Sequence, residues 1–193
     1  MTVAYPIARG IAPMLAAAGA VLIFGENITF YTVIGIIIIS LGILAVGVSH
    51  KIDRHTLFWP LMTGCCIAVY TVVDAQGVRA APTAISYVVW TFLMLGFGIA
   101  SVFAFWRGKQ FILSAAQQWK PGLIAGSLSI VTYGLALLAF RRGTTPRLAA
   151  LRETSILFAT MIAVIFLKEV LTTSRMLGIA AIAIGAMILI IAG

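Results

Sequence analysis

Charged residues are scarce in this sequence. They make up 9% of its 193 residues, whereas soluble domains carry about a quarter. Only five residues are acidic, while hydrophobic residues reach 62% and the mean hydropathy is +1.13. This composition excludes a water-soluble globular domain and indicates a chain that lies in a lipid bilayer. Because a helix needs ~20 residues to cross the hydrocarbon core, little length remains for a soluble domain.

Cysteine and histidine are equally rare, with two residues of each. Cys65 and Cys66 are adjacent in an apolar run, which suits neither a disulfide framework nor a zinc site. No cluster in the sequence has metal-ligand spacing, and no serine has a plausible histidine partner within an apolar segment. We therefore expect no metal, no cofactor and no enzymatic activity.

The net charge of +8 is not a sign of a nucleic-acid partner. Basic residues gather in short clusters between apolar runs, such as Arg107 with Lys109 and Arg141 with Arg142. Such clusters are typical of loops at a lipid headgroup surface. We expect the lipid bilayer, and no nucleic acid, as the surroundings of this chain.

Apolar runs separated by charged clusters, proline and glycine predict an all-α polytopic membrane protein with seven transmembrane helices. The predicted spans are residues 3–24, 30–49, 57–78, 84–106, 119–140, 147–167 and 173–192. Short links join them, which favours antiparallel neighbours in one bundle. Pro6 and Pro13 are expected to kink the first span.

An internal repeat relates the two ends of the chain. A shift of 143 residues superposes the first two spans on the last two without a gap, including Arg9 on Arg152, Glu26 on Glu169, Thr29 on Thr172, Gly35 on Gly178 and Gly42 on Gly185. Copies displaced by five spans enter the membrane from opposite sides, as in the inverted repeats of secondary transporters. The repeat predicts that residues 1–50 hold the last two helices of a first five-helix unit and residues 57–193 a complete second unit. The first three helices of a ten-helix protein would then be missing from the sequence.

Two arginines lie inside apolar spans. Arg9 and Arg152 are each expected about 7–10 Å along their helices, where charges usually face the bundle interior or a wet cavity. The alternative is that each side chain snorkels to the headgroups and anchors its helix. Glu153 and Ser155 belong to the same polar stretch. Because adjacent residues point about 100° apart on a helix, we expect a partner for Glu153 on another helix rather than Arg152.

Asp74 is the only acidic residue of the third predicted span, and Tyr70 lies on the same helix face. Asp74 is either a solvated boundary residue or a carboxylate that takes part in proton coupling. Tyr87, Trp90 and Tyr133 are candidates for lining a substrate pocket, with interface anchoring or ordinary packing as the alternative. For Tyr87, which is close to a span end, anchoring or ordinary packing is the favoured interpretation.

Capping and close packing explain two further patterns. Glu26 and Glu169 each precede a threonine by three residues, which indicates caps at the start of the following helix. Glycines recur at intervals of four or seven residues, which predicts close helix contacts inside the bundle or between two copies of the chain. These glycines are Gly122 and Gly126, Gly35 and Gly42, and Gly178 and Gly185.

These motifs resemble the EamA family of the drug/metabolite transporter superfamily. The resemblance is carried by residues 5–10 running to Gly25-Glu26, by residues 70–79, and by residues 151–159 running to Lys168-Glu169. It implies two inverted five-helix repeats and a multi-pass protein of the bacterial inner membrane that moves small metabolites by alternating access. Lys168 departs from the pattern because it replaces the glycine of the usual Gly-Glu pair.

The leading hypothesis is a secondary transporter of small organic solutes. Its cavity is expected to be lined by Arg9, Tyr70, Asp74, Trp90, Tyr133, Arg152, Glu153 and Ser155. The alternative is a membrane binding or assembly protein that completes its bundle with another chain, either a second copy or the missing helices, and transports nothing. Substrate, direction and coupling ion do not follow from the fold alone.

Overall fold

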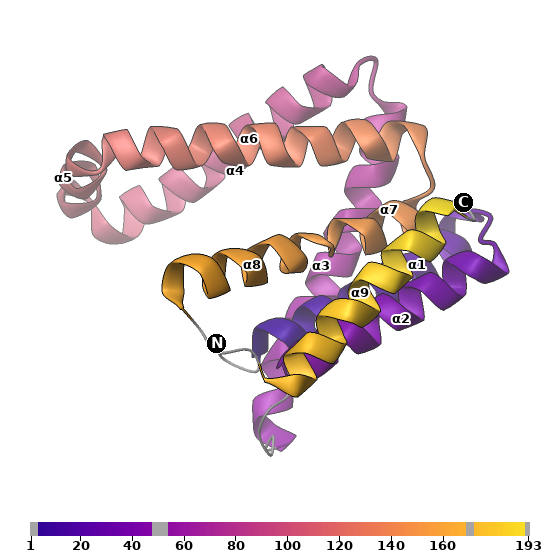
Figure 1. Ribbon diagram of the computed structural model, residues 1–193. Helices are drawn as coiled ribbons and strands as arrows, with labels where there is room; N and C mark the ends of the chain where they lie inside the picture. Colours follow the sequence, from indigo (N-terminus) through magenta and orange to yellow (C-terminus); the bar gives the residue numbers. More distant parts are fainter. Residues whose placement is uncertain (1–3, 48–53, 169–171, 192–193) are drawn as a thin grey trace. The chain divides into compact units, whose positions relative to one another are not determined.

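The computed structural model describes residues 4–47, 54–168 and 172–191, and the regular elements in this part of the chain are helices (Figure 1). They are α1 (Ala4–Phe24), α2 (Phe30–Gly47), α3 (Arg54–Ala80), α4 (Ala84–Arg107), α5 (Lys109–Gln117), α6 (Trp119–Arg142), α7 (Thr145–Arg152), α8 (Ser155–Leu167) and α9 (Thr173–Ile191). Six segments of these residues are long and apolar enough to span a membrane, and Phe30–Val46 is a shorter apolar helix. The predicted polytopic all-α membrane protein is therefore confirmed.

The chain forms two compact units. Unit 1 comprises residues 1–73 and 143–193, so it holds α1, α2, the first part of α3 and α7 to α9. Unit 2 comprises residues 74–142, with the end of α3 and all of α4, α5 and α6. Each unit contains one of the polar clusters described below.

The core of unit 1 lies between α2 and α9, which run side by side (Figure 1). Ile39, Ile43 and Ile182 are almost completely buried there. A Cβ atom added to Gly178 would lie 2.6 Å from the carbonyl oxygen of Gly42. Because backbone atoms of a packed helix cannot move aside, glycine is what allows this approach.

The second glycine pair has the same geometry. A Cβ atom added to Gly185 would lie 2.9 Å from the carbonyl oxygen of Gly35. Gly35, the earlier glycine of α2, thus contacts Gly185, the later glycine of α9, whereas Gly42 contacts Gly178. The two helices are therefore antiparallel. Close packing inside the bundle is thereby confirmed for the four glycines of the repeat.

The glycines of α6 behave differently. In unit 2, α6 packs against α4, and Gly134 approaches Val88 at ordinary contact distance. A Cβ atom added to Gly122 or Gly126 would meet nothing within 4 Å in the described part of the chain. The close packing expected at these two glycines is therefore not found there.

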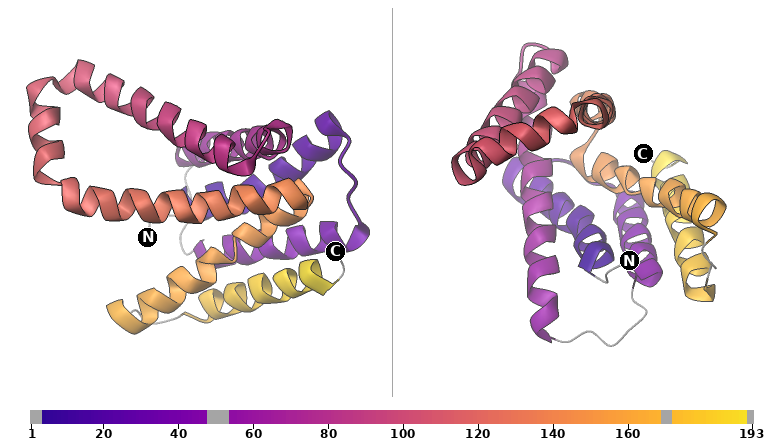
Figure 2. Two further views of the ribbon diagram at one scale, coloured as in Figure 1. Left: turned by 90° about the horizontal axis from the view of Figure 1, so that it is seen from above. Right: turned by 90° about the vertical axis from the view of Figure 1, so that its left-hand side faces the viewer.

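Three local features differ from the sequence prediction. The link between residues 107 and 118 contains the helix α5, which turns the chain from α4 into α6 (Figure 2). Residues of good helix propensity in this segment, together with Gly108 at φ 50°, allow a new helix to begin directly after α4. Pro6 falls in the first turn of α1, where no helix hydrogen bond is lost, and only Pro13 lies in the helix interior.

The third difference concerns the sixth predicted span, which is divided into α7 and α8 at Glu153 and Thr154. The amides of these two residues donate to the carbonyl oxygens of Ala150 and Leu151, each at 3.1 Å. Hydrogen bonds to the third preceding residue are those of a 3₁₀ turn, so the peptide groups remain paired although the α-helix stops. A polar interruption is thus tolerated inside an apolar segment.

Candidate functional site

Glu153 forms an ion pair with Arg9 across unit 1. The Nη1 atom of Arg9 donates to both carboxylate oxygens of Glu153, at 2.9 and 3.0 Å. The Glu153 side chain is 5% exposed and that of Arg9 23%. The expectation that Glu153 finds its partner on another helix is confirmed, because Arg9 lies on α1. The pair joins two segments that are more than 140 positions apart in sequence.

Arg152 lies at the last position of α7, next to this pair. Its Nη2 atom donates to the hydroxyl of Tyr70 at 3.4 Å, and its guanidinium lies 6.0 Å from the centre of the Tyr70 ring. The guanidinium of Arg9 lies 5.5 Å from the ring centre of Tyr5 in the same way. Contacts of arginine with aromatic faces lower the cost of placing its charge in apolar surroundings.

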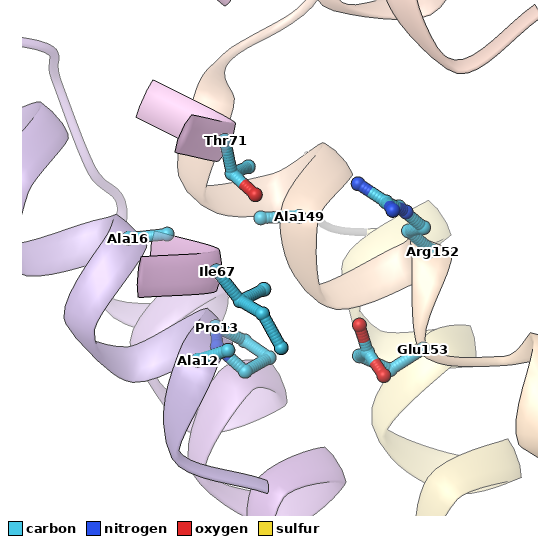
Figure 3. Close-up of a pocket in the computed structure, with 8 residues that line it drawn as sticks. All are labelled: Ala12, Pro13, Ala16, Ile67, Thr71, Ala149, Arg152 and Glu153. Atoms are coloured by element: carbon cyan, nitrogen blue, oxygen red, sulfur yellow. The ribbon is translucent and has the colours of Figure 1, made fainter. Parts of the chain in front are cut away.

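A small pocket opens beside these charges (Figure 3). Arg152 and Glu153 form its polar side, with Thr71 of α3 close by. The remaining lining is small and apolar: Ala12, Pro13 and Ala16 of α1, Ile67 of α3 and Ala149 of α7. Charged, hydroxyl and apolar side chains thus meet at one small pocket of unit 1.

Glu26 stabilises the helix that carries this polar side. Its carboxylate accepts hydrogen bonds from the backbone amide of Thr145 at 2.7 Å and from the Thr145 hydroxyl at 2.6 Å. Glu26 therefore caps the start of α7, a contact that the sequence did not predict. The cap expected at the start of α2 includes Thr29, because its Oγ1 accepts from the amide of Thr32. Glu169, the repeat counterpart of Glu26, lies outside the described residues.

Unit 2 contains a second polar cluster, centred on Asp74. The Tyr87 hydroxyl donates to Oδ1 of Asp74 at 2.8 Å, and the Tyr133 hydroxyl donates to Oδ2. Tyr87 comes from α4 and Tyr133 from α6, so one carboxylate in the last part of α3 joins three helices of the unit. Tyr87, for which anchoring or ordinary packing was the favoured interpretation, thus packs within unit 2 with its hydroxyl bound to this carboxylate.

Gly77 makes room for the Tyr87 ring. A Cβ atom added to Gly77 would lie 2.5 Å from the Tyr87 hydroxyl oxygen. Tyr133 is held from its other side by an edge-on contact with Phe92, with the ring centres 6.0 Å apart. Both phenols are thus positioned by neighbours within the same unit.

The structure brings together part of the predicted site. Arg9, Tyr70, Arg152 and Glu153 form one cluster in unit 1, whereas Asp74 and Tyr133 form another in unit 2. Ser155 is exposed at the start of α8 and is absent from the pocket lining. Trp90 is 61% exposed on α4 and makes no hydrogen bond or ring contact with the described residues.

Sequence reasoning missed the apolar half of the pocket. Ala12, Ala16 and Ala149 are ordinary residues for a membrane helix, so nothing in their identity marks them. The contacts of Tyr87 were easier to recognise in the sequence than this apolar lining, because Asp74 and Gly77 lie a short distance before it. A glycine that faces an aromatic ring is a common packing arrangement.

Comparison with known protein families agrees with the fold. The model of the EamA-like transporter family matches residues 55–191, which include α4 to α9 and nearly all of α3. No curated protein matches the chain. This family is one of membrane transporters of small molecules and not of enzymes, and the multi-pass helical fold agrees with it. Since the matched region is well over half of the 193 residues, the chain belongs to the EamA-like transporter family.

Proposed function

We propose that this protein is a secondary transporter that moves small organic metabolites across the bacterial inner membrane by alternating access. The observation that carries the proposal is the group of three charged side chains, Arg9, Arg152 and Glu153, at a pocket inside apolar helices. Membership of a transporter family supports the same function.

Protein stability alone does not explain why three charged side chains gather inside apolar helices. Burying an ion pair usually contributes less stability than packing apolar side chains of similar volume, because both ions lose their hydration. Charged residues in membrane segments commonly mark the pathways of substrates and ions. The cluster therefore supports a substrate pathway through unit 1, in which Arg152 and Glu153 at the interruption between α7 and α8 form the polar wall and α1 forms much of the apolar wall.

Untargeted analysis of the growth medium tests this function and works for a substrate of any identity. Cells that produce the wild-type protein should enrich or deplete at least one small metabolite relative to cells that produce Arg152→Ala. Arg107→Ala is the matched control, since Arg107 is an exposed arginine at the end of α4. The three proteins must be present in the membrane in equal amounts. Identical media from wild type and Arg152→Ala would contradict the proposal.

We further propose that Asp74 carries the proton that couples transport to the proton gradient. Phenol hydroxyls donate to both carboxylate oxygens of Asp74, and a carboxyl group that gains a proton has one acceptor fewer for such contacts. Because these phenols come from α4 and α6, a change at one carboxylate would be transmitted to both helices.

Asp74→Asn tests this role because asparagine retains the size of the side chain but does not titrate. Flux of a substrate identified in the growth medium should depend on the pH gradient in wild-type vesicles and lose this dependence in the variant. Gln117→Asn, which changes an exposed amide at the end of α5, is the control and should keep the dependence. A retained pH dependence in Asp74→Asn would exclude Asp74 as the proton carrier.

A further inference from the structure

The backbone hydrogen-bond ladder is weakened at the same position of both repeats. Pro13 lies inside α1 and has no amide hydrogen, so the carbonyl oxygen of Arg9, four residues earlier, lacks the donor that an α-helix normally supplies. After Arg152, the amide of Ile156 donates to the carbonyl oxygen of Glu153, three residues earlier, at 3.0 Å, as in a 3₁₀ turn. The shift of 143 residues that superposes the two arginines also superposes Pro13 on Ile156.

The two weak turns have different causes. Proline is the cause in α1, which remains one helix, whereas the Thr154 hydroxyl supports the break between α7 and α8 by donating to the Leu151 carbonyl oxygen at 2.7 Å. The repeat counterpart of Thr154 is Ile11, which has no hydroxyl. Prolines and short 3₁₀ stretches inside long helices are common positions of kinks and hinges. Different residues therefore give the two repeats the same local weakness.

The helical segments beyond the two weak turns are packed differently. In α1, Ala16 and Ala20 are almost completely buried. In α8, Ile156 is the one buried residue among those whose side chains are described, whereas Phe158 and Phe166 are mostly exposed. Segments with few buried contacts are the easiest to displace. Most of α8 can therefore move while α1 keeps its packing.

An ion pair connects the two weak turns. Arg9 begins the first turn and Glu153 lies in the second, and Nη1 of Arg9 donates to both carboxylate oxygens of Glu153 at 2.9 and 3.0 Å. Pro13 and Glu153 also line the same small pocket (Figure 3). A change of backbone angle at one turn therefore displaces a group that is bound to the other.

We infer that residues 9–13 and residues 152–156 are a pair of hinges that bend in turn and are coupled by the ion pair between them. In the arrangement described here α1 is continuous and α7–α8 is broken. In the opposite-facing arrangement α7–α8 straightens, α8 changes its angle to α9, and α1 bends at Pro13. This inference rests on the proposed transport function, because alternating access between inverted repeats exchanges the conformations of equivalent elements.

Distances between two spin labels, measured by pulsed electron paramagnetic resonance in lipid nanodiscs, test the hinges without any substrate. In a background without the native cysteines, labels at Ile165 of α8 and Met187 of α9 report the angle of α8, and both positions are exposed. Labels at exposed Phe30 of α2 and Met176 of α9 form the reference pair, because glycine contacts hold these two helices together. The α8 pair should give two separate distances and the reference pair one.

Variants of the two hinges should change the ratio of the two α8 distances in opposite directions. Thr154→Val keeps the shape of the side chain but removes the hydroxyl that supports the break, so it should favour the straight α7–α8. Pro13→Ala restores the amide donor of α1, so it should favour the continuous α1 and the broken α7–α8. Each ratio should change by about fivefold, the effect of one net hydrogen bond.

Pro6→Ala is the matched control, because Pro6 falls in the first turn of α1, where no helix hydrogen bond is lost. Its distances should equal those of the wild type. If Pro13→Ala does not fold, Pro13→Val replaces it, since valine also has an amide hydrogen and fills more of the buried space. A single distance for the α8 pair, or hinge variants that do not shift the ratio in opposite directions, would overturn the inference.

The growth-medium experiment separates this inference from the function on which it rests. If the media of wild type and Arg152→Ala are identical, the transport function fails, whatever the distances show. If the media differ but the α8 pair gives a single distance, the transport function stands and the hinge pair is wrong.

Discussion

At the residue scale, the pair of Arg9 and Glu153 has the largest expected effect on stability. Arg9→Met leaves the carboxylate of Glu153 buried without its counter-ion, which destabilises a protein by about 3–5 kcal/mol. Replacing both residues by methionine removes both charges and keeps apolar volume, so the double variant should be more stable than Arg9→Met. Melting temperatures in detergent for the two single variants and the double variant complete the cycle. Strictly additive losses would show that the two side chains do not interact.

Lys168 offers a second prediction at the same scale. It ends α8 with φ 51°, a left-handed conformation that is unfavourable for residues with a Cβ atom. The repeat counterpart is Gly25, with φ 66°, so glycine occupies the equivalent position at the end of α1. Lys168→Gly should therefore stabilise the protein by about 1 kcal/mol and raise its melting temperature by a few degrees.

Lys168→Ala separates conformation from charge, because it removes the ammonium group but retains the Cβ atom. Its melting temperature should not exceed that of the wild type. A gain as large as that of Lys168→Gly would attribute the effect to the lost charge instead of the backbone.

At the element scale, the contact between α2 and α9 depends on glycines that the repeat predicted. Gly178→Ala places a Cβ atom 2.6 Å from the Gly42 carbonyl oxygen, so the helices must move apart. Gly126→Ala is the matched control, since it introduces the same atom into α6 where nothing lies within 4 Å among the described residues. Alanine is favoured over glycine in a helix by up to about 1 kcal/mol, so the control should be neutral or stabilised. Thermal unfolding that is equally lowered, or equally unchanged, in both variants would contradict the close packing of α2 on α9.

The elements also show what the sequence can predict. Apolar runs and loop charges predicted each membrane segment, because both follow directly from transfer into lipid. The division between α7 and α8 was not predicted, since the polar stretch at residues 152–155 was taken as part of one span over residues 147–167. The break lies at Glu153, which pairs with Arg9, and α7 begins where Glu26 binds Thr145, so both partners are distant in sequence. Such long-range contacts have no signature in local hydropathy.

At the scale of the whole molecule, our central proposal is that the substrate pathway passes the polar pocket of unit 1. The residue types that carry it, arginine and glutamate inside apolar spans, were identifiable from sequence because charge is so unfavourable there. Their partners were only partly identifiable. Asp74 and Tyr70 were expected in one cavity, yet Asp74 binds Tyr87 and Tyr133 in unit 2 while Tyr70 contacts Arg152 in unit 1. The sequence therefore did not predict which side chains form hydrogen bonds with one another, because these bonds depend on how the helices are arranged in space.

The most direct test of this assignment is the reaction of single cysteines with a charged, membrane-impermeant thiol reagent. Thr71 lines the pocket and is 4% exposed, whereas Val69 lies on the same helix and is 63% exposed along an apolar surface. In a background where Cys65 and Cys66 are alanine, Thr71→Cys should react, because the alternating access that we propose would open the pocket to water during the cycle. Val69→Cys should remain unmodified, because we expect lipid to cover an exposed apolar surface of a membrane helix. If Thr71→Cys stays unmodified while a cysteine at exposed Gln118 reacts fully, the pocket is not a substrate pathway and the central claim is wrong.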